Sequence, residues 1–408
     1  MLVVQKYGGS SLATTERVNH VAKKIIDAYE AGHQVVVVLS AQGKTTDQLI
    51  ARAKALNPHP PKREMDMLLA TGEQQSVALM AMAIEGMGKP VISLSAHQGQ
   101  GGIHSSSVFS NARIQRIDTD RIQGELERKN IVILTGFQGV NKIGDITTLG
   151  RGGSDTTAVA MACALNADVC EIYTDVDGVY TADPHVVSGA KKLTEVSYDE
   201  MLELASLGAK VLHNRSVELA KKHHLNLVVK SSLENKSGTQ IKERTMEKML
   251  ISGLAIDKDV VQVTVIGMKD TPGIAFKLFS MIAKRNITVD VIVQTMGGAL
   301  LKDIAFTVHK NDLDETLEVL EKNKDFLNFD RLGVTDNLAK LSVVGAGMTS
   351  TPGVAAAMFE ALYDVGVNIR LISTSEIKIS VLIDEAEAKM AANSVHERLM
   401  EESMRLNR

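Results

Sequence analysis

A long internal repeat constrains the fold of this chain most strongly. The segment TPGIAFKLFSMIAKRNITVDVIVQT, which starts at Thr271, aligns without a gap with TPGVAAAMFEALYDVGVNIRLISTS, which starts at Thr351. Each copy reads as a strand, a tight Thr-Pro-Gly turn, a helix, two strands and a second helix. Proline pre-sets the turn, and glycine opens the N-terminus of the helix. The repeat therefore predicts two ferredoxin-like βαββαβ units in the C-terminal part of the chain.

The strands of these two units do not count evenly along the sequence. LISGLAID and VVQVTVIG both precede the first Thr-Pro-Gly turn, whereas only a helical stretch follows the last strand, IKISVLID. Two βαββαβ units need eight strands, so we expect the early strand, residues 250–257, to complete the second unit. The two units would then be interlocked rather than arranged in series.

The first 230 residues show a different pattern, in which short β-branched runs alternate with helical stretches. The runs are LVVQKYGG, QVVVVLS, PVISLS, NIVILTGF, VCEIYTDVDG and LNLVVKSS. QVVVVLS is apolar on both faces, which is typical of a strand in a parallel sheet covered by helices on both sides. We expect an α/β domain with a doubly wound, largely parallel sheet. A charged stretch read as helical, QIKERTMEKML, separates it from the repeat. The expected boundaries are 1–245 for this domain, 246–337 for the first repeat unit and 338–408 for the second.

Charge and hydropathy narrow the range of functions. The 408 residues carry a formal net charge of -4, which argues against nucleic acid or an anionic membrane as the main partner. No apolar stretch approaches the roughly 18 residues of a membrane helix, and MLVVQKYGGSS does not fit a signal peptide, so we expect a cytosolic protein. Cys163 and Cys170 lack the close spacing of a zinc site and are expected to be reduced, buried thiols.

Two glycine-containing loops could bind phosphate. SAQGKTT contains Gly-Lys-Thr, but a P-loop needs another glycine five positions before the Gly-Lys pair, and Val38 stands there. VQKYGGSS instead ends the first strand at the carboxyl edge of the expected sheet, where open α/β sheets bind ligands. There Gly8 and Gly9 allow backbone amides to approach an anion, Ser10 adds a hydroxyl, and Lys6 supplies a positive charge.

Three further stretches carry polar residues that suit a charged substrate. TTLGRGGSDTTA places Arg151, Gly152, Gly153, Ser154 and Asp155 at the start of an apolar helix, where an arginine and helix amides can bind a carboxylate. TGEQQSVAL places Glu73 early in an apolar helix, and IYTDVDGVYTADP ends a strand in acidic and hydroxyl residues. The plainer alternatives are a helix N-terminal charge for Glu73 and a surface hairpin for residues 175–183.

The order of these motifs resembles that of the aspartokinases, which belong to the amino-acid kinase family. The resemblance rests on KYGGSS, SAQGKTTDQL, TGEQQSVAL, TGFQGVN, TTLGRGGSDTTA, YTDVDGVYTADP and ASLGAKVLHNRSVELA, and the C-terminal repeat resembles a pair of ACT domains, which sense amino acids. It implies transfer of the γ-phosphoryl group of MgATP to the side-chain carboxylate of L-aspartate. That carboxylate is ionised at neutral pH, so the reaction needs no general base.

The resemblance also implies roles for individual residues. Lys6 would be catalytic, and Asp155 would orient it. The residues implied for aspartate are Ser40, Thr46, Glu73 for the ammonium, Arg151 for a carboxylate, Gly152, Gly153 and Ser154. Those implied for ATP are Lys6, Gly8, Gly9, Ser10, Tyr173, Thr174, Asp175, Tyr180, Asp183 and Lys210, with Mg²⁺ bound mainly through ATP. The sequence departs from the family at His185, where arginine is usual after Ala-Asp-Pro.

The ACT repeat predicts feedback control by an amino acid. Its expected ligand site lies at the first turn and the next strand, with Asp270, Gly273, Ala275, Asp290 and Gln294. The second repeat carries Arg370 at the position of Asp290, so the two sites should differ in preference. We expect lysine, alone or jointly with threonine, as the inhibitor, and a homo-oligomer or an oligomer with an ACT-only subunit.

Three other functions remain open at this stage. A kinase of the same fold could act on N-acetylglutamate, glutamate or UMP, although such kinases lack the tandem ACT tail. A dehydrogenase with an ACT sensor would need Gly-x-Gly-x-x-Gly after the first strand, and the nearest string, GAGMTS, misses the third glycine. A non-catalytic amino-acid sensor would bind a ligand without turning over ATP.

Overall fold

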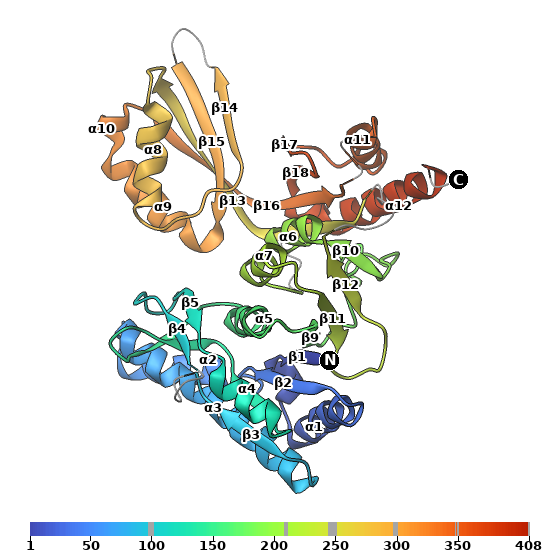
Figure 1. Ribbon diagram of the computed structural model, residues 1–408. Coiled ribbons are helices and arrows are strands. Elements are labelled where there is room, and N and C mark those ends of the chain that lie inside the picture. The colour runs from blue at the N-terminus through green and yellow to red at the C-terminus, as the bar shows by residue number, and fades with distance from the viewer. Residues whose placement is uncertain are drawn as a thin grey trace. The chain divides into compact units, whose positions relative to one another are not determined.

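The computed structural model describes residues 1–96, 102–207, 211–243, 251–296, 301–346, 348 and 351–406. The chain divides into two compact units (Figure 1). The first comprises Met1–Tyr180 and Lys192–Lys248, and the second comprises Thr181–Lys191 and Met249–Arg408. None of the described helices is both long and apolar enough to cross a bilayer.

The first unit is built on an eight-stranded sheet whose order is β10-β12-β11-β9-β1-β2-β6-β3. Its strands are β1 (Leu2–Tyr7), β2 (Gln34–Leu39), β3 (Val91–Leu94), β6 (Ile131–Thr135), β9 (Val169–Thr174), β10 (Glu195–Ser197), β11 (Leu227–Ser231) and β12 (Thr239–Lys242). All neighbouring pairs are parallel except β11 with β12. Five of the six β2 residues are buried, as its unbroken apolar run predicts.

Helices pack on both faces of this sheet. The helices of this unit are α1 (Thr15–Glu30), α2 (Thr45–Leu56), α3 (Lys62–Gly86), α4 (Asp120–Glu127), α5 (Gly153–Ala164), α6 (Tyr198–Ser206) and α7 (Asn214–Lys222), with a 3-10 turn at Gly9–Leu12. The apolar sides of α1 and α3 form one core with Tyr7, Val35 and Tyr173. On the opposite face α5 contacts β1 and β2 and is buried along most of its length, because its residues are small.

A second, four-stranded sheet was not anticipated from the sequence. It comprises β4 (Ile103–Ser105), β5 (Ile114–Ile117), β7 (Gln138–Val140) and β8 (Ile146–Thr148), in the order β5-β4-β7-β8. These strands have only three or four residues each, too few to show a clear alternation in the sequence. The sheet matters for function because β8 leads directly into the loop that carries Arg151.

The second unit contains a six-stranded sheet in the order β14-β15-β13-β16-β18-β17. The strands are β13 (Gly253–Lys269), β14 (Ile292–Met296), β15 (Leu301–His309), β16 (Arg331–Val344), β17 (Leu371–Thr374) and β18 (Lys378–Asp384). The helices are α8 (Ile274–Ala283), α9 (Leu313–Lys322), α10 (Lys324–Leu327), α11 (Val354–Asp364) and α12 (Ala388–Leu406), with 3-10 turns at Lys310–Asp312 and Glu385–Glu387.

Two long strands connect the repeat units, as the uneven strand count predicts. The first part of β13, residues 253–257, pairs with residues 340–344 of β16, next to β18 and β17. Beyond a register shift, β13 residues 260–266 pair with β16 residues 331–338, next to β15 and β14. Each long strand therefore serves both repeat units, and the six strands provide eight strand segments. This is the interlocked pairing expected for residues 250–257.

The sequence boundary between the two parts needs two corrections. Gln240–Lys242, read as the start of a charged helix, belong to strand β12, and residues 244–250 lie outside the described part of the chain. Residues 181–191, placed in the first domain, belong to the second unit. Leu254 donates its N–H to the carbonyl oxygen of Thr181 at 2.7 Å, and Ala182 and Val187 are buried in the core around α11 and α12.

Candidate active site

The centre of the candidate site is an ion pair between Lys6, near the carboxyl end of β1, and Asp155, in the first turn of α5. Lys6 Nζ lies 2.6 Å from Asp155 Oδ1, and the two side chains are 12% and 13% exposed. Successive strand residues point to opposite faces, so Lys6 lies on the α5 face, whereas Tyr7 belongs to the α1 and α3 core. The fold brings these two residues, 149 positions apart in the sequence, into contact at the carboxyl edge of the sheet, where the sequence predicts a ligand site.

The glycines after β1 are required by close backbone contacts. A Cβ atom on Gly9 would lie 2.5 Å from the carbonyl oxygen of Ala41, so a side chain cannot fit there without a shift. The Gly43 N–H donates to the Gly9 carbonyl at 2.9 Å, which ties the SAQGKTT loop to the loop after β1. This contact brings the two loops to the same edge of the sheet.

The N-terminus of α5 forms the other wall. Gly152 caps the helix in a left-handed conformation with φ 69°, which favours glycine. A Cβ on Gly136, after β6, would lie 2.7 Å from Ser154 Oγ, so the start of α5 packs directly against the end of that strand. Arg151 is exposed, and its guanidinium forms no ion pair among the described residues.

Glu73 is a buried carboxylate beneath the SAQGKTT loop. It lies in the middle of α3 rather than early in its helix, so the helix N-terminal alternative is wrong. The Ala41 N–H donates to Glu73 Oε1 at 3.0 Å, whereas Oε2 is buried and has no hydrogen-bond partner among the described residues. Burial raises the pKa of Glu73 to about 7, despite the opposing hydrogen bond from Ala41. Such a carboxylate is suited to receive a cation.

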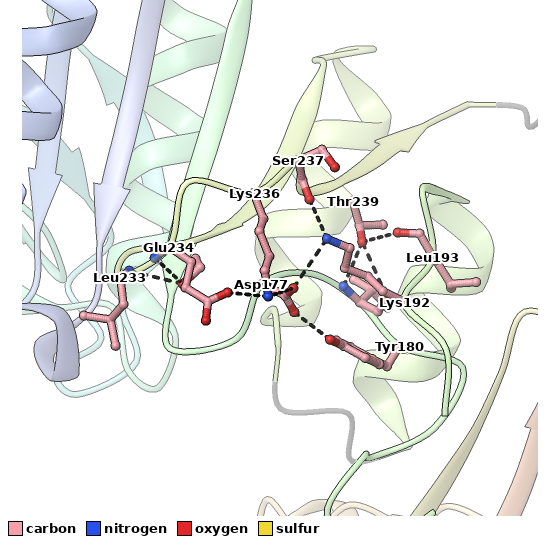
Figure 2. Close-up of polar contacts among 11 residues, drawn as sticks. Asp177, Tyr180, Lys192, Leu193, Leu233, Glu234, Lys236, Ser237 and Thr239 are labelled. Carbon is pink, nitrogen blue, oxygen red and sulfur yellow. Dashed lines mark hydrogen bonds and ion pairs between the residues drawn. The ribbon is translucent and has the colours of Figure 1, made fainter. Parts of the chain in front are cut away.

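A polar cluster follows β9, as Figure 2 shows. Its centre is Asp177, whose Oδ1 accepts the Tyr180 hydroxyl at 2.7 Å. Asp177 Oδ2 lies 3.4 Å from Lys192 Nζ and 3.8 Å from Lys236 Nζ. Partial burial opposes ionisation, but the bond from Tyr180 and the two lysines outweigh it and lower the pKa of Asp177. Lys236 Nζ also lies 2.7 Å from Glu234 Oε2, so two carboxylates match the two lysines of this cluster.

Three of the residues assigned to ATP are Tyr173, Asp183 and Lys210. The Tyr173 ring lies on the α1 and α3 face and stacks on Tyr7 with ring centroids 4.6 Å apart, so only its backbone is at the strand edge. Asp183 belongs to the second unit, where its side chain accepts the N–H of His185 at 2.9 Å. Lys210 lies outside the described residues.

The remaining ATP-side and aspartate-side residues lie in the first unit. Thr174 Oγ1 donates to Asp175 Oδ1 at 3.0 Å at the end of β9. Ser40 follows β2 and Thr46 lies in the first turn of α2, both partly buried, while Ser10 is exposed in the loop after β1. Sequence reasoning missed Asp177, Lys192 and Lys236. Asp177 belongs to the IYTDVDGVYTADP stretch, but no local pattern in the sequence connects it with lysines 15 and 59 residues away.

The expected effector residues of the second unit are ion-paired within that unit. Asp270 pairs with Lys302, and Asp290 pairs with Lys340, whose side chain is 6% exposed and also lies 3.7 Å from Asp257 Oδ2. Gly273 caps α8 with φ 86°, Ala275 lies in the first turn of that helix, and Gln294 is an exposed residue of β14. A ligand ammonium at either aspartate would compete with a lysine of the protein itself.

Comparisons with known proteins bear on both units. The chain matches the amino acid kinase family over residues 1–231 and the ACT domain over residues 263–323 and 341–399. It is 48% identical to the aspartokinase of Bacillus sp. (strain MGA3) over 398 residues, which cover 97% of this chain and 96% of the relative.

Two solved structures of Escherichia coli aspartokinase III resemble the fold. The complex with aspartate and ADP, described as the R-state, is 25% identical, with a TM-score of 0.84, and covers 98% of this chain and 100% of the other. The complex with lysine and aspartate, described as the T-state, is also 25% identical, with a TM-score of 0.77, and covers 98% and 99%.

Proposed function

This chain belongs to the amino acid kinase family, among the aspartokinases that carry ACT domains, and from that premise we propose how its residues perform the reaction. It is an aspartate kinase, an enzyme that transfers the γ-phosphoryl group of ATP to the side-chain carboxylate of L-aspartate. The product is 4-phospho-L-aspartate. The roles of individual residues below are our own assignment.

The Lys6–Asp155 ion pair is the observation that carries the assignment of the catalytic centre. The reaction brings an anionic carboxylate against a polyanionic phosphate, so it depends on positioning and on positive charge rather than on a base. We assign Lys6 to the transferring phosphoryl group. Asp155, 2.6 Å away, holds the ammonium group of Lys6 in place. The amides around Gly8 and Gly9 add further donors to the phosphates.

Opposite charges hold the two ends of aspartate. We assign the substrate ammonium to Glu73 Oε2, because this buried carboxylate oxygen has no partner among the described residues. Arg151 binds a substrate carboxylate, supported by the N-terminal amides of α5 at Gly152, Gly153 and Ser154. Ser40 and Thr46 contribute hydroxyls from the SAQGKTT loop, which the Ala41 contact places beside Glu73.

We assign ATP binding to the residues at the end of β9. Thr174, Asp175 and Tyr180 lie there, and we assign the ammonium groups of Lys192 and Lys236, which face Asp177, as donors to the phosphates. Within the described residues no three acidic, histidine or cysteine side chains gather to hold a metal ion. We propose that Mg²⁺, bound mainly by phosphate oxygens and water, neutralises part of the phosphate charge.

The second unit is proposed to regulate the first. Lysine, alone or jointly with threonine, is the proposed inhibitor, and the T-state complex of aspartokinase III with lysine supports this choice. The proposed site uses Asp270 for the ligand ammonium and the amides after Gly273 for its carboxylate. We further propose that the chain forms a homo-oligomer or assembles with an ACT-only subunit.

Trapping with hydroxylamine tests the proposed function. The full chain is incubated with MgATP, hydroxylamine and either L-aspartate, L-glutamate or N-acetylglutamate, and the hydroxamate is identified by mass spectrometry. We expect a hydroxamate only with L-aspartate, on its side-chain carboxyl group. A hydroxamate that forms only with another acid would assign a different kinase activity, and no hydroxamate with any acid would favour a non-catalytic sensor.

A further inference from the structure

The loop that carries Arg151, residues 149–152, needs a support that its own sequence does not provide. Gly150 and Gly152 both adopt left-handed conformations, with φ 79° and φ 69°. Glycine gains more backbone freedom in the unfolded chain than other residues, so a loop with two glycines is held in one shape only by contacts around it. Besides the bond from the Leu149 N–H to the carbonyl oxygen of Phe137 at 2.8 Å, those contacts come from two sides.

One side is α3 and β8, which fix the start of the loop. Asp66, fully buried in α3, accepts the N–H of Thr148 at 2.8 Å and the Thr148 hydroxyl at 2.8 Å. It also accepts the N–H of Ser110 at 2.8 Å. The bonds of Asp66 end at Thr148 and the Phe137 bond ends at Leu149, so neither reaches Gly150, Arg151 or Gly152.

The other side is the N-terminus of α7, which contacts the loop twice. The Arg215 guanidinium donates to the carbonyl oxygen of Leu149 at 2.6 Å and to that of Ala112 at 3.0 Å. The His213 side chain covers the α-carbon of Gly152, where an added Cβ would lie 2.3 Å from the His213 Cγ. The two contacts are made on either side of Arg151.

The tautomer of His213 follows from its cap. His213 is the N-cap of α7, and its Nδ1 accepts the N–H of Arg215 at 3.4 Å. A neutral imidazole whose Nδ1 accepts carries its proton on Nε2. Burial and the charges of Arg215 and Arg151 lower the pKa of His213, although Asp155 opposes this, so the ring is neutral at pH 7 and can keep its cap.

We propose that His213 and Arg215 are positioning residues that hold the Arg151 loop in the shape that binds L-aspartate. Neither residue needs to touch the substrate in this role. His213 prevents Gly152 from moving toward α7, and Arg215 fixes Leu149, so the backbone between them presents the Arg151 guanidinium in one direction. The inference rests on the proposed function, because it assigns the loop to aspartate.

The test compares substrate affinities in full-length variants. In His213→Asn the asparagine can still cap α7 through its side-chain oxygen, but the ring on Gly152 is lost. In Arg215→Lys the charge remains, but the two-carbonyl contact is lost. The matched control is His223→Asn, because His223 is exposed at the other end of α7. KM for L-aspartate, KM for ATP and the melting temperature are measured for each chain.

We expect each variant to raise the KM for L-aspartate about tenfold while KM for ATP changes much less, because a displaced binding group weakens one substrate selectively. The control should match the wild type. A merely structural role would lower the melting temperature or the active fraction without this difference between substrates. Unchanged aspartate KM in both variants, or an equal loss for both substrates, would overturn the proposal.

Two further outcomes are a failure of both α7 variants to fold and a wild type without activity. If both α7 variants fail to fold, His213→Ser decides, because serine can also cap α7 while it removes the ring from Gly152. A selective rise in aspartate KM supports the positioning role, and its absence overturns it. A wild type without aspartate-dependent turnover contradicts the proposed function, whereas variants that match an active wild type contradict only the role of α7.

Discussion

Glu73 gives the site its clearest pH dependence. Its pKa is raised to about 7 by burial, so below that pH the carboxyl group is mostly protonated and cannot pair with the substrate ammonium. We expect the KM for L-aspartate to fall about tenfold between pH 6 and pH 8 and then to level off. The measurement is a pH series of aspartate KM at saturating ATP. Glu73→Gln should bind aspartate weakly at every pH, and a flat wild-type profile would contradict the assignment.

The same residue should make the folded protein less stable as pH rises. A carboxyl group whose pKa is higher in the folded than in the unfolded chain favours folding when protonated, so stability is lost between about pH 4.5 and pH 7. Glu73→Gln removes this cost and should raise the free energy of unfolding at pH 8, by at most about 3 kcal/mol. Urea denaturation at pH 8 measures it. If the variant is less stable than the wild type at pH 8, the burial of the ionised Glu73 carboxylate does not destabilise the folded protein, and the prediction is wrong.

Arg151 should not tolerate lysine. An arginine can bind a carboxylate through two parallel hydrogen bonds, whereas lysine offers a point charge. Arg151→Lys should therefore raise the KM for L-aspartate by about tenfold or more while KM for ATP stays near the wild-type value. Steady-state kinetics with each substrate varied separately provide the check, and unaltered aspartate kinetics would exclude the clamp.

At the scale of elements, the interlocked strands should make the second unit unfold as one. Ala255 in β13 pairs with Ser342 of β16, in the part of these strands that serves the second repeat. Ala255→Pro removes a backbone N–H from the part of β13 that pairs with β16, because proline has none, and so weakens this pairing. Because β16 continues into the first repeat, amides of residues 331–338 should lose protection from hydrogen exchange together with those of 340–344. Loss confined to 340–344 would show two independent units.

The sequence predicted long elements and missed short ones for a physical reason. β1, β2 and β9 are six-residue strands in which at least four residues are apolar, and the two repeated segments, which align at a spacing of 80 residues, indicate the two C-terminal units. By contrast, β4 and β7 have three residues each, and the ion pairs of Asp177 depend on how distant loops meet. The contact between Lys6 and Asp155 could be predicted because Lys6 lies near the carboxyl end of a strand and Asp155 at the start of a helix, and both positions meet at one edge of the sheet.

The packing of segment 181–191 could not be predicted from its sequence. Its TADP motif follows β9 in the sequence, and the resemblance to aspartokinases predicts that it binds the nucleotide with β9. The segment instead packs with the second unit, where Thr181 Oγ1 lies 2.8 Å from His396 Nε2. That contact joins residues 215 positions apart, and no periodicity in the segment indicates it. The role of Asp183 toward ATP therefore remains a proposal.

At the scale of the whole molecule, the ACT unit should act through a coupling free energy. A coupling of about 1 to 3 kcal/mol changes activity roughly 5- to 150-fold. We expect lysine, alone or with threonine, to weaken the aspartate-dependent rate within this range. Asp270→Ala should lose the inhibition while keeping the uninhibited rate, because Asp270 lies in the second unit and binds the proposed ligand ammonium. Each amino acid is tested alone and in pairs, and inhibition that persists in Asp270→Ala would reject this site.

The most direct test of the whole account is the turnover of Lys6→Ala. If Lys6, oriented by Asp155, supplies the positive charge for phosphoryl transfer, turnover should fall by at least about a hundredfold, because a pre-organised donor is lost in the transition state. Binding of L-aspartate, measured separately by calorimetry, should change far less. A Lys6→Ala enzyme with near-normal turnover would contradict the catalytic centre proposed here.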